Sequence, residues 1–235
     1  MDFFELINKR RSVRKFKDTE VPESVMRKCL KASVLAANSS NLQPWEFYWI
    51  RDEKKKRKVV AACFSQNAAK QAKELVIAVS RIDTWKRNRD LIIEEHKKKN
   101  KFIPLVDKYY NKLIPFAYYH DRLGISSLIK RFIFLFINIY GYFKPVIRGP
   151  IYKHELFETV SKTTALACQN FMMAIVAEGY DSCPMEGFDE QRIKKILKLN
   201  WQSHIVMIIG VGKAASNGVY SERFRIDDSL VIKEV

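Results

Sequence analysis

The chain has 235 residues and a formal net charge of +16. This length suits one large domain better than two domains of equal size. A hydrophobic fraction of 47% with only eight glycines and seven prolines excludes a disordered or fibrous protein, because so apolar a chain can fill a core. We therefore predict a single globular domain over residues 1–235.

The four cysteines lie far apart, with no C-x-x-C pair and no histidine cluster beside them. This spacing predicts neither a disulfide scaffold nor a zinc site, and we expect no metal. The N-terminus lacks the basic start and apolar run of a signal peptide. We therefore expect a reducing compartment and a cytoplasmic location.

Apolar residues recur at helical spacing in residues 2–9 and 22–37, and each stretch predicts an amphipathic helix. Residues 46–51 are aromatic and β-branched, as strands are, and residues 75–80 form the short apolar run of a buried strand. Asp52 can cap a charged helix between these two strands. A sheet with helices beside it is therefore predicted.

Residues 85–155 differ from the rest of the chain. They contain 15 Lys and Arg against six Asp and Glu, so a net +9 of the charge lies in this range. Tyrosines and phenylalanines are interleaved with the basic residues. We interpret this range as a basic, aromatic insertion or lid made of helices.

The C-terminal part returns to clear periodicity. Residues 159–178 are so apolar that we expect this helix to be buried on nearly every side, with Gly179 at its end. Residues 189–197 predict a short basic helix, and residues 205–209 a second buried strand that closes on glycines. The tail from Val219 onward is expected to be irregular.

Three segments carry residues suited to a polar ligand. Residues 10–14 (RRSVR) place three guanidiniums and a hydroxyl after a helix, which can clamp a phosphate, or form a solvated basic turn. Residues 38–45 gather amides and hydroxyls that can contact a polar ring, or form an ordinary turn. Residues 184–189 offer backbone N–H groups around Gly187, or only a helix cap.

Taken in order, these segments resemble the motifs of the nitroreductase family of flavin enzymes. That family shows an R-R-S-x-R run, a P-S-S-x-N-x-Q-P-W loop and a P-x-E-G-F segment after a long helix. Here RRSVR, ANSSNLQPW and PMEGF stand at residues 10–14, 37–45 and 184–188. In addition, the RFR at residues 223–225 matches the family's C-terminal K/R-x-R.

The resemblance covers residues 1–80 and 156–230 and gives residues 85–155 no counterpart. Ala37 and Asn38 stand where the family usually has Pro and Ser. The resemblance implies a three-layer α+β fold with a central, mainly antiparallel sheet flanked by helices. It also implies a homodimer with FMN bound at each subunit interface.

The resemblance assigns the phosphate end of FMN to a set of arginines. Arg10 and Ser12 would hold the phosphate and the ribityl chain, with Arg11 nearby. Arg223 and Arg225 would assist them from the C-terminal tail.

The flavin ring would have other contacts. Arg14 would lie beside the N1/O2 edge, where a positive charge stabilises the anionic reduced ring. Backbone N–H groups of Glu186 and Gly187 would approach N5 and O4, and Asn67 the pyrimidine edge. Three side chains would approach the ring from the partner subunit: Ser39, Asn41 and Gln43.

The implied activity is hydride transfer from NADH or NADPH to flavin N5, and then to a nitroaromatic, quinone or similar small-molecule acceptor. Such a reaction needs no general base, so no catalytic acid or base is assigned. The four histidines are scattered without spaced partners. Five rings of residues 85–155 could stack on a planar acceptor: Tyr109, Tyr110, Phe116, Tyr118 and Tyr119.

A second function class is a basic protein that binds nucleic acid or a membrane surface. Aromatics interleaved with Lys and Arg over residues 97–153 could stack on single-stranded bases. Lys130-Arg131 followed by FIFLFINIYGYF could lie in a lipid interface, although this run is too short to span a bilayer. Packing of these rings against the sheet or across a dimer is the simpler interpretation, so nucleic acid is not an expected partner. Peripheral membrane contact stays open.

Overall fold

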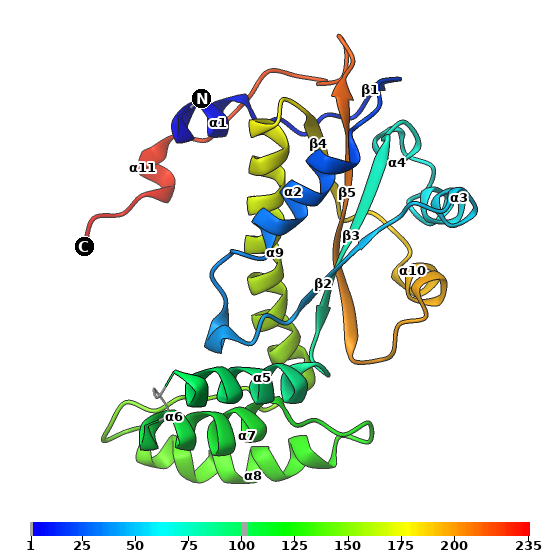
Figure 1. The fold of residues 1–235 in the computed structure, drawn as a ribbon. Helices are drawn as coiled ribbons and strands as arrows, with labels where there is room; N and C mark the ends of the chain where they lie inside the picture. The colour runs from blue at the N-terminus through cyan, green and yellow to red at the C-terminus, as the bar shows by residue number, and fades with distance from the viewer. Residues whose placement is uncertain (1, 100–102) are drawn as a thin grey trace.

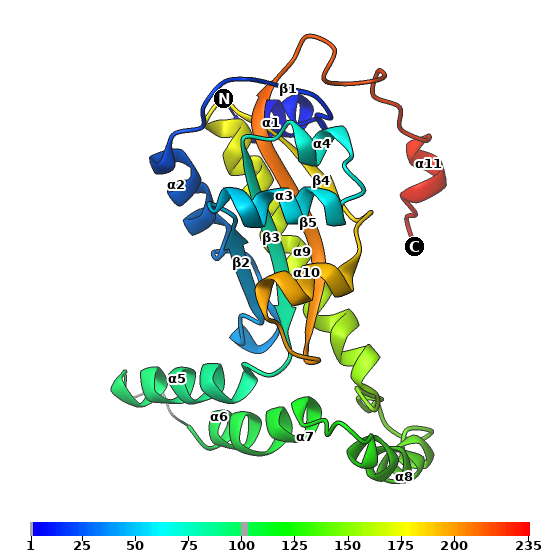
Figure 2. The ribbon, with the colours of Figure 1, turned by 90° about the vertical axis from the view of Figure 1, so that its right-hand side faces the viewer.

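The computed structural model describes residues 2–99 and 103–235. A five-stranded sheet stands between two layers of helices (Figure 1). One layer holds α2 (Glu23–Ser33) and α9 (Lys153–Ala177). The other layer is made of three helices seen in front of the sheet in Figure 2: α3 (Glu53–Ala62), α4 (Asn67–Lys70) and α10 (Glu190–Leu197).

The strands follow the order β1-β5-β3-β2, and β4 also pairs with β5. Every strand pair is antiparallel, and a lone parallel bridge joins Ser12 to Ser182. The expected three-layer α+β fold with a mainly antiparallel sheet is therefore confirmed. The strands are β1 (Phe16–Lys17), β2 (Trp45–Trp49), β3 (Glu74–Arg81), β4 (Asp181–Met185) and β5 (Ser203–Ala214).

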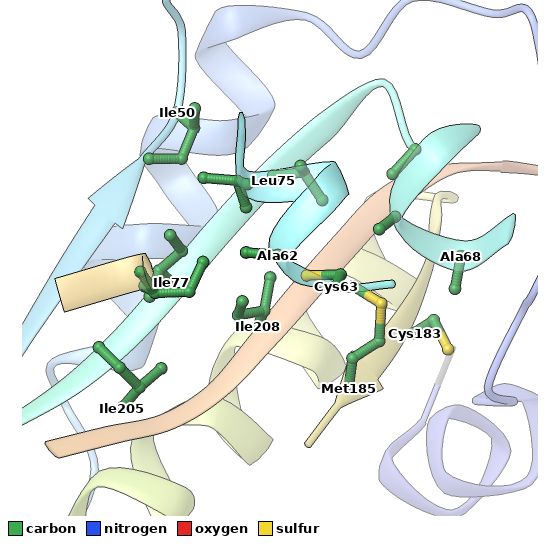
Figure 3. Close-up of a cluster of buried hydrophobic side chains, with 14 of the residues drawn as sticks. Ile50, Ala62, Cys63, Ala68, Leu75, Ile77, Cys183, Met185, Ile205 and Ile208 are labelled. Carbon is green, nitrogen blue, oxygen red and sulfur yellow. The ribbon is translucent and has the colours of Figure 1, made fainter. Parts of the chain in front are cut away.

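The alternation of side chains along β3 makes two cores, one on each face of the sheet. Leu75, Ile77 and Val79 pack against α3, α4 and α10. Val76 and Ala78 pack against α2 and α9 on the opposite face. Figure 3 shows the first core, where Cys183 and Met185 of β4 join Cys63 and Ala68.

Two strand predictions fell short of the structure. β5 continues to Ala214, beyond the glycines that were expected to end it. A Cβ built on Gly210 would lie 2.6 Å from the Ala68 carbonyl oxygen, so this glycine permits close packing of α4 instead of ending the strand. β4 was not predicted because Pro184, which lacks an N–H donor, argues against a strand.

Within one chain helix α9 leaves one face exposed, so its burial on nearly every side stays a prediction that depends on the expected homodimer. Its sheet-facing side is buried, but Leu166 is 52% exposed. Composition alone concealed that residues at four-residue spacing share the outer face. The exposed residues of α9 are His154, Glu158, Lys162, Leu166, Gln169, Asn170 and Ala177.

The helices within residues 85–99 and 103–140 lie together at one end of the sheet (Figure 1). A separate apolar cluster joins these helices to Leu42 and to Leu156 of α9. Tyr110 and Tyr118 are buried in this cluster and cannot stack on an acceptor, contrary to the expectation. The helical elements are α5 (Trp85–Lys98), α6 (Pro104–Lys108), a π-helical turn (Tyr109–Leu113), α7 (Ile114–Tyr118) and α8 (Ile125–Tyr140).

The N-terminus lies near the end of the molecule opposite α8, and the C-terminal tail ends at about mid-height (Figure 1). α1 (Phe3–Lys9) contacts α9, and the C-terminal tail carries a short helix, α11 (Asp228–Val231). Over residues 2–99 and 103–235, no helix has both the length and the apolar character needed to cross a lipid bilayer.

Candidate functional site

The C-terminal tail returns to the segment that follows α1. The Arg223 guanidinium donates hydrogen bonds to the carbonyl oxygens of Asn8 and Arg10, at 2.8 and 2.7 Å. Arg11 donates to the Ser221 carbonyl at 2.6 Å. The two basic motifs, far apart in the sequence, therefore meet at one place.

We call Arg10, Arg11, Arg14, Arg223 and Arg225 the arginine cluster. Burial lowers the pKa of half-buried Arg10, and the positive charges of Arg223, Arg225 and Arg11 lower it further. Among the residues that the structure describes, no carboxylate lies within ion-pair distance of any of the five. Mutually repelling guanidiniums without an acidic partner fit a multiply charged anion such as a phosphate.

Ser12 is fixed against β4. The Val13 N–H donates to the Ser182 carbonyl at 3.0 Å, and Ser12 itself forms the parallel bridge to Ser182. The Ser182 hydroxyl is buried and has no hydrogen-bond partner among the described residues. The next residue, Cys183, lies close enough to Arg10 and Arg14 to feel their charge, although burial dominates and raises the pKa of its thiol.

β4 leads from the arginine cluster to the PMEGF segment. Four residues separate Ser182 from Glu186, which is about 13 Å of extended chain. Glu186 and Gly187 are exposed, and within the described chain neither backbone N–H donates a hydrogen bond. Two free donors therefore stand at the far end of the strand.

Asn67, the first residue of α4, is brought to the same place. The neighbouring Gln66 side chain donates to the Gly187 carbonyl at 2.9 Å. The close contact of Gly210 with Ala68 holds α4 against β5, and Asn67 is exposed. Asn67, Glu186 and Gly187 therefore form one polar edge at the end of β4.

The loop at residues 38–45 has an unusual backbone conformation that exposes alternate residues. Ser40, Asn41 and Gln43 have positive φ angles, and the Gln43 N–H donates to the Asn38 side chain at 3.0 Å. Buried Leu42 and Pro44 alternate with three exposed polar residues: Ser39, Asn41 and Gln43.

The helices of residues 85–118 support this loop. Ser40 and Tyr109 share a hydrogen bond of 2.5 Å between their hydroxyls, and the Tyr110 hydroxyl donates to the Ser40 carbonyl. The Asn88 side chain donates to the Leu42 carbonyl at 2.7 Å. Sequence reasoning missed these supporting residues, because contacts between positions more than 40 apart leave no local pattern.

Within one chain the loop does not reach the arginine cluster. Trp45 pairs with Ser80, which pairs with His204 near the start of β5. The arginine cluster lies beside Ser182, which pairs with Val211 near the other end of β5. Seven residues of strand, about 23 Å, separate these two positions. The predicted contacts therefore fall into two groups at opposite ends of the sheet.

A cavity of about 820 Å³ lies on the loop side, between α2, β2 and α5. Asn41 and Gln43 line it together with basic side chains of α5 and the following residue, namely Arg87, His96 and Lys99. The aromatic ring of His96 also packs against that of Tyr110, with 6.2 Å between ring centroids. The cavity therefore joins two predicted flavin contacts to the helical region.

The sequence model of the nitroreductase family matches residues 7–213. The chain belongs to the nitroreductase family. The resemblance found in the four motifs is thereby confirmed, and the protein is an oxidoreductase.

Several matched relatives span nearly the whole chain. Protein DrgA of Synechocystis sp. is 26% identical over 91% of this chain and 84% of its own length. A protein of Thermus thermophilus named NADH dehydrogenase is 22% identical over 93% and 90%. A crystal structure from Exiguobacterium sibiricum, described as a nitroreductase in complex with FMN, has a TM-score of 0.70 at 21% identity and covers 100% of this chain and 98% of its own.

Proposed function

We propose that this nitroreductase-family protein is a homodimeric, FMN-dependent enzyme that takes hydride from NADH or NADPH and passes it to a nitroaromatic, quinone or similar acceptor. The observation that carries the proposal is the arginine cluster, which has no acidic partner in the described chain. The names of its relatives support it, since one is called an NADH dehydrogenase and another is crystallised with FMN.

When bound, FMN supplies the hydride chemistry, and the protein binds and orients it. Arg10, Arg223 and Arg225 neutralise the phosphate, and Ser12 holds the adjoining chain. Arg14 supplies positive charge at the N1/O2 edge of the ring. No side chain needs to give or take a proton for hydride transfer, which fits the absence of an assigned acid or base.

The second proposal concerns the subunit that supplies the loop. Ser39, Asn41 and Gln43 are exposed, yet they lie at the other end of the sheet from the arginine cluster of their own chain. A partner subunit can bring its loop to that cluster, and a two-fold axis then makes two equivalent sites. We therefore propose that each flavin is contacted by residues of both subunits.

Mixed dimers test this assignment. One chain carries Arg10→Ala with Arg225→Ala, and the other carries Asn41→Ala with Gln43→Ala. If each site uses both subunits, a mixed dimer has one site with all four changes and one site with none. Co-expression with two affinity tags should then give one tightly bound FMN per mixed dimer, whereas each parent homodimer binds weakly. Two weak sites in the mixed dimer would place all contacts in one chain and refute the shared site.

The helices of residues 85–140 are proposed to set acceptor choice. The loop-side cavity is lined by Arg87 and Lys99 and also by two carboxylates, Glu46 and Glu95. Glu95 is ion-paired with Lys99 at 2.6 Å, so Arg87, which has no carboxylate within ion-pair distance among the described residues, supplies the charge that favours anionic acceptors by steering. Arg87→Glu with Lys99→Glu should lower kcat/KM for an acidic quinone relative to its neutral analogue, at unchanged flavin content. An unchanged ratio for the two acceptors would remove these helices from acceptor selection.

The flavin itself has a direct test. Purified protein should be yellow, and anaerobic addition of NADH or NADPH should bleach the flavin absorbance band. Protein that is colourless and also fails to bind added FMN would overturn the proposed function.

A further inference from the structure

Helix α8 turns most of its apolar side chains outward. Its buried residues are Ser126, Lys130 and Phe134. The Lys130 ammonium donates hydrogen bonds to the carbonyl oxygens of Ala117 and Tyr119, at 3.0 and 2.9 Å. The exposed apolar residues of the helix are Ile125, Leu128, Ile129, Phe132, Ile133, Leu135, Phe136, Ile139 and Tyr140.

This orientation is the reverse of that expected for a surface helix, whose charged residues face water and whose apolar stripe faces the core. Phe132 is 65% exposed and Phe136 is 57% exposed, and their rings contact each other at 5.3 Å between centroids. The exposure continues beyond the helix at Tyr142, Phe143 and Ile147. So extended an apolar surface indicates a partner.

Two hollows adjoin this apolar surface. A hollow of about 780 Å³ between α7 and α8 is lined by Phe116, Leu123 and Ile129. A second hollow of about 930 Å³ lies along α8 and reaches Ile151 and Tyr152. Helices α7 and α8, which supply much of their lining, lie at the lower end of the molecule in Figures 1 and 2, away from α1 and α11.

The charge of this surface points to an anionic partner. Residues 122–154 contain no Asp or Glu. Arg122 and Arg131 are exposed near the first half of α8, and Lys144 is exposed beyond its end. The six basic residues of this range are Arg122, Lys130, Arg131, Lys144, Arg148 and Lys153.

We propose that α8 and the segment to residue 148, here called the α8 surface, dock this protein on the surface of an anionic lipid bilayer. The helix lies in the plane of the interface, with Phe132 and Phe136 among the acyl chains and the exposed basic side chains, such as Arg131 and Lys144, at the headgroups. Sixteen residues of helix measure about 24 Å, too short to cross a hydrocarbon core of about 30 Å. A second copy is a poorer fit, because two acid-free basic faces repel each other.

Vesicle sedimentation tests this with the full-length protein. Vesicles of phosphatidylglycerol and phosphatidylcholine in equal parts should bind the protein at least about tenfold more tightly than vesicles of phosphatidylcholine alone, because headgroup charge attracts the basic residues. Phe132→Ser with Phe136→Ser should weaken this binding at least about tenfold, since two exposed rings lose their place in the lipid.

Two charge-reversal variants test the proposal even if Phe132→Ser with Phe136→Ser fails to fold. Arg131→Glu with Lys144→Glu changes the α8 surface, whereas Lys54→Glu with Lys55→Glu makes the same change in net charge on exposed positions of α3. The first should weaken binding at least about tenfold, and the second less than about threefold. The flavin content should be the same in both.

Four results would overturn the proposal. These are no sedimentation with the anionic vesicles, equal binding to neutral vesicles, equal losses from the two charge reversals, and a change of oligomeric mass in Phe132→Ser with Phe136→Ser. The last result would assign the α8 surface to a second copy of the chain. The first three results do not bear on the flavin, so this proposal and the proposed function can fail separately. The fourth would place the α8 surface in the proposed dimer and would leave flavin binding to be judged by its own test.

Discussion

Removing two guanidiniums from the arginine cluster should separate flavin binding from folding. In the variant Arg10→Ala with Arg225→Ala, each lost hydrogen bond to a charged phosphate is worth about 1.5–3 kcal/mol. The two losses together weaken FMN binding by about two to four decades. Equilibrium dialysis with the flavin absorbance as readout measures this change.

The same change has a thermal signature. At free FMN one hundred times the wild-type Kd, binding stabilises the protein by about 2.7 kcal/mol. A loss of two decades in affinity removes most of that gain. For a chain of this size, the Tm of the variant at this FMN concentration should therefore be about 5–10 °C below that of the wild type.

Without FMN the variant should behave differently. Arg10 is half-buried and repelled by Arg223, Arg225 and Arg11, which is why its pKa is lowered. Its removal relieves this repulsion, so the Tm of the flavin-free protein should stay unchanged or rise. Arg57→Ala with Lys58→Ala, which removes two exposed charges from α3, should leave both temperatures unchanged. If the flavin-free variant loses as much stability as the flavin-bound one, the cluster is structural and the reasoning is refuted.

Three further predictions follow from the packing and the charges. Gly210→Ala should lower the free energy of unfolding by about 1–3 kcal/mol in urea titrations, because the added Cβ meets the Ala68 carbonyl. In the control Gly187→Ala, the added Cβ meets only the Gln66 side chain at 3.9 Å, and the loss should be less than a third of that. Equal losses in the two variants would contradict the packing argument. Burial lowers the pKa of His120 below 6.5, the Lys130 ammonium lowers it further, and the Asp121 carboxylate opposes the shift. The unfolded chain therefore binds a proton at His120 more tightly than the folded chain does. The free energy of unfolding should for this reason decrease as the pH falls below 6.5. His120→Asn should flatten the dependence of the urea midpoint on pH between about 7 and 5, and an unchanged slope would show that His120 does not cause it. Glu23→Gln should lower Tm only slightly, because its ion pairs with Arg27 and Arg51 are exposed to water, and a fall in Tm as large as that caused by Gly210→Ala would disagree.

The sequence by itself determined many of the local elements and the family, and it supplied the candidate binding residues. Asp52 and Asp189 cap helices as expected, since their carboxylates accept from backbone N–H groups three residues on. The apolar run at residues 75–80 became β3, the strand between the two cores. Such features depend on neighbours a few residues away, so they can be predicted from a single sequence.

The extent of the sheet was decided by tertiary contacts. β1 and β4 exist because β5 supplies their hydrogen-bond partners, and neither has a strong strand sequence of its own. Gly210 looked like the end of a strand, but it marks the point where α4 approaches β5 most closely. A glycine is compatible with the end of a strand and with the close approach of a helix to a strand that continues. The position of α4 in the fold determines that the second applies at Gly210.

The arrangement of the site was also decided by the fold. The resemblance implied that Arg223 would assist Arg10 and that Asn41 and Gln43 would come from the partner subunit. The fold supplied the contact itself, a hydrogen bond from Arg223 to the Arg10 carbonyl, and the position of the loop at the opposite end of the same sheet. The apolar run of α8 was visible in the sequence, whereas its outward orientation depends on Lys130 finding two carbonyl oxygens at the end of α7. Periodicity fixes which residues share a face of a helix, and only the packing of the whole chain decides which face meets the protein and which is left for a partner.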